Sequence, residues 1–573
     1  MMREIEGCTV IVYDQTCAAE KRRRRKRGLF PDPAKRVFIN DEVCEGCGDC
    51  SVKSNCVSVE PLETELGRKR KINQSACNKD FSCLKGFCPS FVSVYGGQPA
   101  KVKTDKHLSQ VPENDPFQNL PMPGTAKIDG AFGILVTGIG GTGVVTVGQL
   151  LGMAAHLEGK GVTVLDFTGL AQKNGAVLSH IQIAESPEDL HAVRIANSGA
   201  DLMIACDMVV AASREALSRV SKGGTRAIVN SHLAPTAAFT LNPDLKYGPT
   251  ATQDAIRMAA GDNQTNFIDA TRIATALMGD SIATNLFMLG YAFQQGQLPI
   301  SLDSLMRAIE LNGVAIDMNK RTFNWGRLAA VDASAVEDAA KPSIAEEDTK
   351  KFSETLDEII DDRMTRLTEY QNAAYAQRYQ DLVRKVEREE KARSGGFTGL
   401  AETVARNYYK LLAYKDEWEV ARLYSAPEFQ RKIRQQFEGS YKLKLNLAPP
   451  LITQTDPVTG MPEKREFGPW VFTLLRIMSK YRHLRGGFWD IFGRTAERKM
   501  ERRLISEYED VITQITDKLN SSNHFAAMEL AGLPEQMRGF GHVKEENVKQ
   551  AKAREEQLLN AFNNPAPQAN AAE

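Results

Sequence analysis

The chain has 573 residues, too many for one hydrophobic core, and this length predicts several domains. With 42% hydrophobic and 25% charged residues, its composition is typical of a globular protein and excludes a disordered or fibrous one. Lys plus Arg and Asp plus Glu number 72 each, so no overall charge favours nucleic acid, a membrane surface or an acidic substrate. The cysteines are unevenly distributed, with most of them between Cys44 and Cys88.

Residues 1–30 are too few to form a domain and carry the basic run KRRRRKR at positions 21–27. No aromatic residue lies among these arginines to stack on bases, so we expect the run to pair with acidic groups of a neighbouring domain or partner rather than with nucleic acid. The N-terminus lacks a signal-peptide pattern, and we therefore predict a cytoplasmic location. In that compartment, clustered cysteines are more often metal ligands or redox groups than disulfides.

Residues 31–108 contain the clustered cysteines and little apolar sequence, which predicts a small domain stabilised by bound metal. Two residues separate Cys44 from Cys47 and Cys47 from Cys50. This spacing places three thiolates on one tight loop, as in bacterial ferredoxins, where a distant Cys-Pro supplies the fourth ligand. Cys88 precedes Pro89, so we predict a 4Fe-4S cluster on Cys44, Cys47, Cys50 and Cys88.

Three further cysteines, Cys56, Cys77 and Cys83, suggest a second cluster. Asp80 lies midway between Cys77 and Cys83, where a middle cysteine would be expected, and a carboxylate can bind iron. We therefore predict a second cluster on these cysteines, with Asp80 or solvent as fourth ligand. Zinc is the alternative, but it usually takes two cysteine pairs and leaves a third cysteine at the same interval without a role.

Residues 109–130 contain four prolines and are typical of an extended linker. Between residues 131 and 335 strand-like and helix-like runs alternate, which indicates a Rossmann-like α/β domain with a largely parallel sheet. An uncharged stretch, Gly130–Leu157, resembles a membrane span, but its glycines divide it into a strand, a turn and a helix that are each too short to cross a bilayer. We therefore predict no membrane association.

A glycine loop follows the first strand of this domain, with Gly138, Gly140, Gly141 and Gly143 at the turn into a helix. The amides at such a helix N-terminus attract anions. Asp166 closes the next strand, where a dinucleotide site has its ribose-binding acid. These five residues are therefore candidates for binding a cofactor. Alternatively, the glycines only let the helix and sheet pack closely.

Residues 336–573 are rich in charged, helix-favouring sequence. Apolar residues from Phe352 to Leu367 recur on one helical face, which predicts a helical C-terminal domain with a polar tail. The expected fold is therefore multidomain: a small ferredoxin-like iron–sulfur domain, a Rossmann-like α/β domain and an all-α domain.

The run VCEGCGDCSVKSNC, the glycine loop GILVTGIGGTGVVTVGQLLGMAA and the segment TGLAQKNGAVLSHIQIA closely resemble the second half of the fused indolepyruvate ferredoxin oxidoreductases. These enzymes belong to the 2-oxoacid:ferredoxin oxidoreductase superfamily. The resemblance covers essentially the whole chain and implies oxidative decarboxylation of an arylpyruvate by thiamine diphosphate and Mg, with coenzyme A accepting the acyl group and soluble ferredoxin the electrons. Residues 131–335 would be the gamma domain, in which the glycine loop is not an established NAD site.

The segment at residues 13–28 resembles the end of the thiamine diphosphate-binding domain that precedes the ferredoxin domain in this family, but the body of that domain is absent. The resemblance therefore implies an electron-transfer and gamma portion that works, in an oligomer, with a thiamine diphosphate-binding subunit or a missing N-terminal segment. Two alternatives stay open. One is an iron–sulfur reductase that binds NAD(P)H at the glycine loop, and the other is a non-catalytic scaffold stabilised by its clusters.

Overall fold

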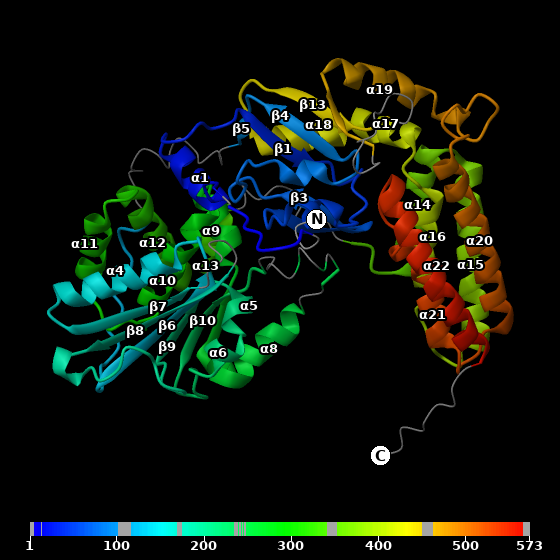
Figure 1. Ribbon diagram of the computed structural model, residues 1–573. Coiled ribbons are helices and arrows are strands. Elements are labelled where there is room, and N and C mark those ends of the chain that lie inside the picture. The colour runs from blue at the N-terminus through cyan, green and yellow to red at the C-terminus, as the bar shows by residue number, and fades with distance from the viewer. Residues whose placement is uncertain are drawn as a thin grey trace.

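The computed structural model describes residues 5–12, 14–100, 116–168, 175–233, 239, 242, 244–245, 248–340, 352–449 and 462–564. Figure 1 shows three parts: an α/β unit, a cysteine-rich part and a helical bundle. The cysteine-rich part lies between the other two (Figure 1). Of the expected linker, residues 109–115 fall outside the described ranges, and residues 116–130 run without helix or strand up to the first strand of the α/β unit.

A six-stranded mixed sheet forms the centre of the α/β unit. Its order is β11-β10-β9-β6-β8-β7. The strands are β6 (Ala131–Ile139), β7 (Gly161–Thr168), β8 (Ala176–Ala184), β9 (Leu202–Ala205), β10 (Arg226–Asn230) and β11 (Thr265–Ile268). β11, β10, β9 and β6 pair in parallel, but β8 is antiparallel to both β6 and β7. The expectation of a largely parallel, Rossmann-like sheet is therefore confirmed, with β8 as the antiparallel exception.

Helices cover both faces of this sheet (Figure 1). One face packs on α4 (Val144–Leu157), α9 (Ala270–Met278), α10 (Thr284–Gln294), α11 (Leu302–Asn312), α12 (Ile316–Val331) and α13 (Ala333–Ala340). The other packs on α5 (Met208–Ala211), α6 (Arg214–Leu217) and α8 (Pro249–Ala260). Alternation along β6 explains the two cores, because Ile134 and Val136 face the first set of helices and Leu135 faces the second.

The cysteine-rich part contains a short antiparallel sheet that the C-terminal region completes. β1 (Lys35–Ile39) pairs with β4 (Phe91–Tyr95), and β2 (Val59–Thr64) forms a hairpin with β3 (Gly67–Ile72). The remaining elements are α1 (Ala18–Lys26), α2 (Asp49–Ser54), the 3-10 helix η2 (Ser82–Lys85) and β5 (Gln98–Pro99).

Three strands come from the region that was expected to be purely helical: β12 (Phe437–Glu438), β13 (Lys442–Leu447) and β14 (Arg465–Phe467). β13 pairs with β4 and with β14, so the sheet order is β1-β4-β13-β14, while β12 pairs with β5. The purely helical expectation is therefore wrong at these strands. Pairing with β13 satisfies the backbone groups of β4, which would otherwise form an exposed sheet edge.

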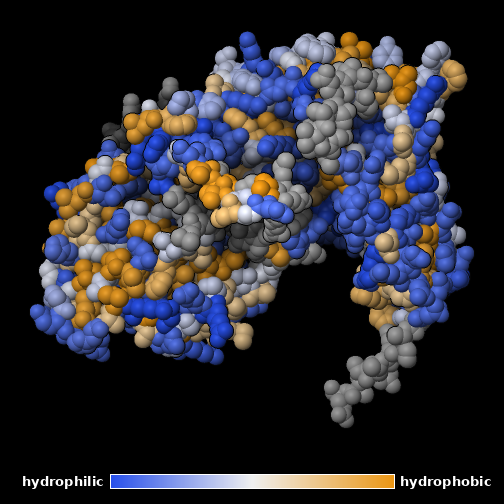
Figure 2. Space-filling view, in the orientation of Figure 1, coloured by the Kyte–Doolittle hydropathy of each residue, from blue (hydrophilic) through white to orange (hydrophobic). Residues whose placement is uncertain are grey.

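The remaining helices form the bundle and a cover over the extended sheet. The bundle contains α14 (Leu356–Tyr370), α15 (Ala373–Arg393), α16 (Leu400–Leu412), α20 (Ala496–Lys518), α21 (His524–Ala531) and α22 (Gly541–Asn563). The cover contains α17 (Glu417–Ser425), α18 (Pro427–Gln436) and α19 (Trp470–Lys480). Hydrophilic residues prevail on the visible face of the bundle (Figure 2). Among the described helices, none combines the length and the apolar character needed to cross a membrane.

Candidate functional site

The first cysteine set, Cys44, Cys47, Cys50 and Cys88, lines one small cavity. The loop between β1 and α2 turns tightly at Gly46, where a Cβ atom would lie 2.1 Å from the carbonyl oxygen of Arg68. Gly86 brings the second segment close, because a Cβ atom there would lie 2.7 Å from the Cα of Cys50. Glycine at position 86 therefore lets the Cys-Pro segment approach the cysteine loop, and glycine at position 46 lets that loop approach β3.

These thiols lie in an environment suited to the positively charged core of an iron–sulfur cluster. Burial raises the pKa of Cys50, and the negative charges of Cys88 and Cys44 raise it further, because like charges repel strongly in a low dielectric. The thiolates also have hydrogen-bond donors: the Gly46 amide lies 3.3 Å from the Cys44 sulfur, and the Ser90 hydroxyl lies 3.0 Å from that of Cys88. Bound iron would remove the mutual repulsion, so the donor set fits an iron–sulfur cluster.

The second set, Cys56, Cys77 and Cys83, joins the same apolar cluster of side chains. Burial raises the pKa of Cys83 to about 12, with further increases from the charges of Cys77, Cys56 and Asp80. These four groups therefore lie close enough to act on one another. The structure thus brings together the residues predicted for a second cluster, although their ligand roles stay predictions.

Asp80 is exposed and already accepts two hydrogen bonds. Its Oδ1 atom lies 3.2 Å from the amide and 3.0 Å from the hydroxyl of Ser82, so the carboxylate closes the turn that leads into η2. Its second oxygen has no such contact to Ser82. Asp80 as an iron ligand therefore stays a prediction alongside solvent.

Among the described residues, no three His, Cys, Asp or Glu side chains meet at a point where one metal ion would bind. A zinc ion requires its ligands around a single centre. A cubane is larger and takes one thiolate at each iron, so its ligands stand apart around it. The choice between a cluster and zinc therefore stays a prediction for these thiols.

Three cations that sequence reasoning missed approach the cysteines. Arg70 of β3 is fully buried; burial lowers its pKa, and the charges of Cys44 and Cys50 oppose that change. Lys464 donates to the carbonyl oxygen of Gly86. Lys415 lies 3.3 Å from the carbonyl oxygen of Cys44. Both lysines belong to the C-terminal region, so only the tertiary structure identifies them.

The basic run of residues 21–27 also contacts a cysteine segment. Arg22 donates to the carbonyl oxygen of Ser75, and Arg25 donates to that of Asn78. These carbonyls flank Cys77, so α1 holds the segment that carries this cysteine. The run therefore bonds to backbone oxygens, which no charge pattern in the sequence indicated.

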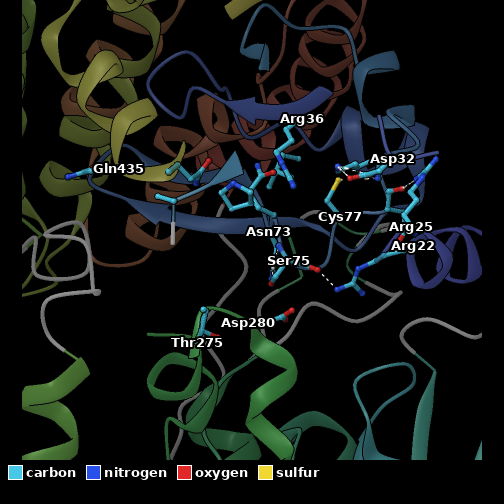
Figure 3. A pocket seen from close by; sticks show the side chains of 18 residues that line it. Arg22, Arg25, Asp32, Arg36, Asn73, Ser75, Cys77, Thr275, Asp280 and Gln435 are labelled. Atoms are coloured by element: carbon cyan, nitrogen blue, oxygen red, sulfur yellow. Dashed lines mark hydrogen bonds and ion pairs between the residues drawn. The ribbon is translucent and has the colours of Figure 1, made fainter. Parts of the chain in front are cut away.

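A cavity of about 460 Å³ adjoins this contact. Arg22, Arg25 and Cys77 lie on one side of it, and Thr275 and Asp280 of the α/β unit lie across from them (Figure 3). The cavity thus lies between the cysteine-rich part and the α/β unit. It is lined by Cys77, a predicted ligand of the second cluster.

The glycine loop of the α/β unit serves close packing. A Cβ atom on Gly138 would lie 2.5 Å from a methyl group of Val144 at the start of α4. Gly141 and Gly143 have φ angles of +84° and +104°, which favour glycine. Gly140 donates its amide to the carbonyl oxygen of Gly175, at 2.8 Å. The alternative prediction, in which small residues let the helix meet the sheet, therefore fits Gly138, whereas Gly141 and Gly143 are required by the turn.

Asp166 does not lie where a dinucleotide site needs it. It belongs to β7, whereas Gly138 belongs to β6, and β8 lies between these strands. In a dinucleotide site the ribose-binding acid follows the strand next to the glycine loop. The inserted antiparallel strand therefore separates the two halves of the predicted cofactor site.

Comparison with protein families matches two segments of the chain. Residues 133–329 match the family described as pyruvate ferredoxin/flavodoxin oxidoreductase. Residues 356–557 match a family of unknown function, DUF6537. The first match covers most of the α/β unit, and the second covers most of the bundle together with strands β12, β13 and β14.

Curated relatives align with about a third of the chain. The indolepyruvate oxidoreductase subunit IorB of Pyrococcus horikoshii is 26% identical over 203 residues, which cover 35% of this chain and 96% of the relative. The subunit of the same name from Methanothermobacter thermautotrophicus is 28% identical over 205 residues, which cover 35% of this chain and 99% of the relative.

Solved structures with a similar segment include the pyruvate oxidoreductase subunit PORC of Thermotoga maritima, with a TM-score of 0.26, 23% identity and coverage of 34% of this chain and 95% of that one. The gamma subunit of a keto/oxoacid ferredoxin oxidoreductase from Geobacter sulfurreducens has a TM-score of 0.26, 19% identity and coverage of 35% and 98%. The family and sequence matches confirm the predicted resemblance over residues 133–329, which are similar to the pyruvate ferredoxin/flavodoxin oxidoreductase family and to the IorB subunits.

Proposed function

We propose that this chain is the electron-transfer and gamma portion of a 2-oxoacid:ferredoxin oxidoreductase that acts on an arylpyruvate such as indolepyruvate. The observation that carries the proposal is the set of four thiols, Cys44, Cys47, Cys50 and Cys88, around one cavity. The match to the oxidoreductase family and the names of the IorB relatives support the reaction class and the substrate.

In this proposal, thiamine diphosphate and Mg are bound by a partner subunit or a preceding segment, and the reaction takes place in the cytoplasm. Coenzyme A accepts the acyl group, and soluble ferredoxin accepts the electrons. Bound 4Fe-4S clusters supply one-electron acceptors, which the two-electron oxidation of an oxoacid requires when ferredoxin is the final acceptor.

The chain's own residues prepare the environment for such clusters. Buried Val37, Ile39 and Phe91 surround the cysteines and exclude water, which strengthens electrostatic interactions. The Gly46 amide and the Ser90 hydroxyl lie within hydrogen-bond distance of sulfurs of the first set. The buried Arg70 guanidinium adds positive charge beside this set. These groups favour anionic cysteine ligands in an otherwise apolar site.

The primary test is the metal content of the full chain, purified without oxygen. We expect about four iron atoms and four acid-labile sulfides for each assembled cluster, with an EPR signal after reduction. Cys47→Ser should lose about one cluster of iron. Cys206→Ser is the matched control, because Cys206 is a buried cysteine of the α/β unit that lies outside both sets. Stoichiometric zinc without sulfide would contradict the proposal.

A coupled assay tests the reaction itself. In complex with the thiamine diphosphate-binding partner, Cys47→Ser should abolish ferredoxin reduction by the oxoacid, whereas the partner should continue slow decarboxylation. Ferredoxin reduction at the wild-type rate would refute the electron-transfer role. Reduction of the clusters by the oxoacid in the wild-type complex would exclude a purely structural scaffold.

A further inference from the structure

The C-terminal region delivers a lysine to the cysteine-rich part. Lys464 immediately precedes β14, which pairs with β13, and β13 pairs with β4. β4 begins shortly after Cys88. Strand pairing therefore fixes Lys464 beside the cysteines, although more than 370 residues separate it from Cys88 in the sequence. This lysine lies within the segment matched to the family of unknown function.

Its ammonium group contacts the connection between the two cysteine sets. The Nζ atom donates to the carbonyl oxygen of Gly86 and lies 3.5 Å from that of Cys88. It also lies 4.7 Å from the centre of the Phe91 ring. Gly86 directly follows η2, which carries Cys83, and packs against Cys50. The ammonium is therefore at the point where segments of both sets meet.

The electrostatics agree with this position. Burial lowers the pKa of Lys464, and the charges of Cys88, Cys50 and Cys83 oppose that change. Cys88 and Cys50 belong to the first set, whereas Cys83 belongs to the second. In contrast, the cysteines that act on Arg70 all belong to the first set, and the cysteine that acts on Arg22 belongs to the second.

We propose that Lys464 is shared by the two cysteine sets and that its positive charge stabilises the reduced state of the clusters on both. The inference rests on the proposed function. One-electron reduction adds a negative charge to a cluster that is already anionic with its cysteine thiolates, so a nearby cation favours the reduced state and raises the reduction potential. In this proposal, the segment that matches the family of unknown function, residues 356–557, helps to set the reduction potential of the clusters.

The test is an EPR-monitored redox titration of the full chain, reconstituted with iron and sulfide without oxygen. Lys464→Gln should lower the reduced-to-oxidised ratio of both signals about tenfold at a fixed potential, which corresponds to about 59 mV for a one-electron couple. Lys464→Arg keeps the charge and should stay close to wild type. Lys444→Gln is the matched control, since Lys444 lies on β13 of the same sheet, with its ammonium 4.6 Å from the Tyr95 ring centre.

Each outcome has a distinct meaning. Unchanged potentials in Lys464→Gln, or a shift of one signal only, would overturn the shared role. Loss of iron from Lys464→Gln with retention in Lys464→Arg would support it, because Arg keeps the positive charge at this position and Gln removes it. Loss from both variants while circular dichroism stays native would overturn it. A wild-type chain without iron and sulfide would instead overturn the proposed function, and this inference with it.

Discussion

The ion pair between Lys415 and Glu45 joins the C-terminal region to the first cysteine loop, and Lys415→Met tests its contribution. Glu45 lies between Cys44 and Cys47, and the two charged atoms are 2.6 Å apart, with side chains 10% and 19% exposed. Burial raises the pKa of Glu45, but Lys415 and other lysines outweigh this effect and lower the pKa well below its ordinary value. The carboxylate therefore stays charged at neutral pH, and Lys415→Met removes its closest cation.

Breaking a fully buried pair costs about 3–5 kcal/mol, because the remaining charge is left without its partner. Since this pair is slightly exposed, we expect Lys415→Met to lower the free energy of local opening of the cysteine loop by about 2–3 kcal/mol. Each 1.4 kcal/mol changes an equilibrium constant tenfold, so local opening of the cysteine loop should become roughly 30- to 150-fold more frequent.

The assay is the rate at which an iron chelator removes iron from the anaerobic, reconstituted chain at pH 7. Lys415→Met should release the iron of the first set roughly 30- to 150-fold faster than wild type. Lys391→Met is the matched control, because Lys391 also pairs with a glutamate, at 2.7 Å, but is 75% exposed, and such surface pairs contribute little. Equal release rates in wild type and Lys415→Met would refute the reasoning.

Three further predictions concern the α/β unit. Burial raises the pKa of Asp207 to about 6, so the stability of the wild type should fall as pH rises from about 4 to 6. Asp207→Asn keeps the cap on the Val210 amide. In thermal unfolding this variant should be more stable than wild type by roughly 1–3 kcal/mol at pH 8, but not near pH 4. Gly290→Ala places a Cβ atom 2.0 Å from the Phe323 carbonyl oxygen and should lose about 3 kcal/mol. Gly124→Ala, with nothing within 4 Å, should melt like wild type. NADH should not bleach the clusters of the isolated chain; bleaching would favour the reductase alternative.

Local spacing allowed several features to be predicted from the sequence. The interval between Cys44, Cys47 and Cys50 requires a tight loop, and the structure has these thiols together with Cys88 around one cavity. The glycines from Gly138 onward predicted a strand, a turn and a helix, which are β6 and α4. The cysteine loop and the strand, turn and helix each depend on residues within one or two turns of each other, so periodicity and turn chemistry suffice. Cys88 was predicted from the Cys-Pro pattern of bacterial ferredoxins.

Other features depend on contacts between distant segments, and only the tertiary structure decided them. The alternating sequence KLKLNL of β13 is suited to a strand, but nothing in it specifies β4 as its neighbour. Likewise, the run that forms β8 does not reveal that it lies between β6 and β7 and separates Asp166 from the glycine loop. Lys415 and Lys464 approach the cysteines for the same reason. Hydrophobic pattern specifies an element and its buried face, whereas strand neighbours and long-range ion pairs follow from how all the elements pack together.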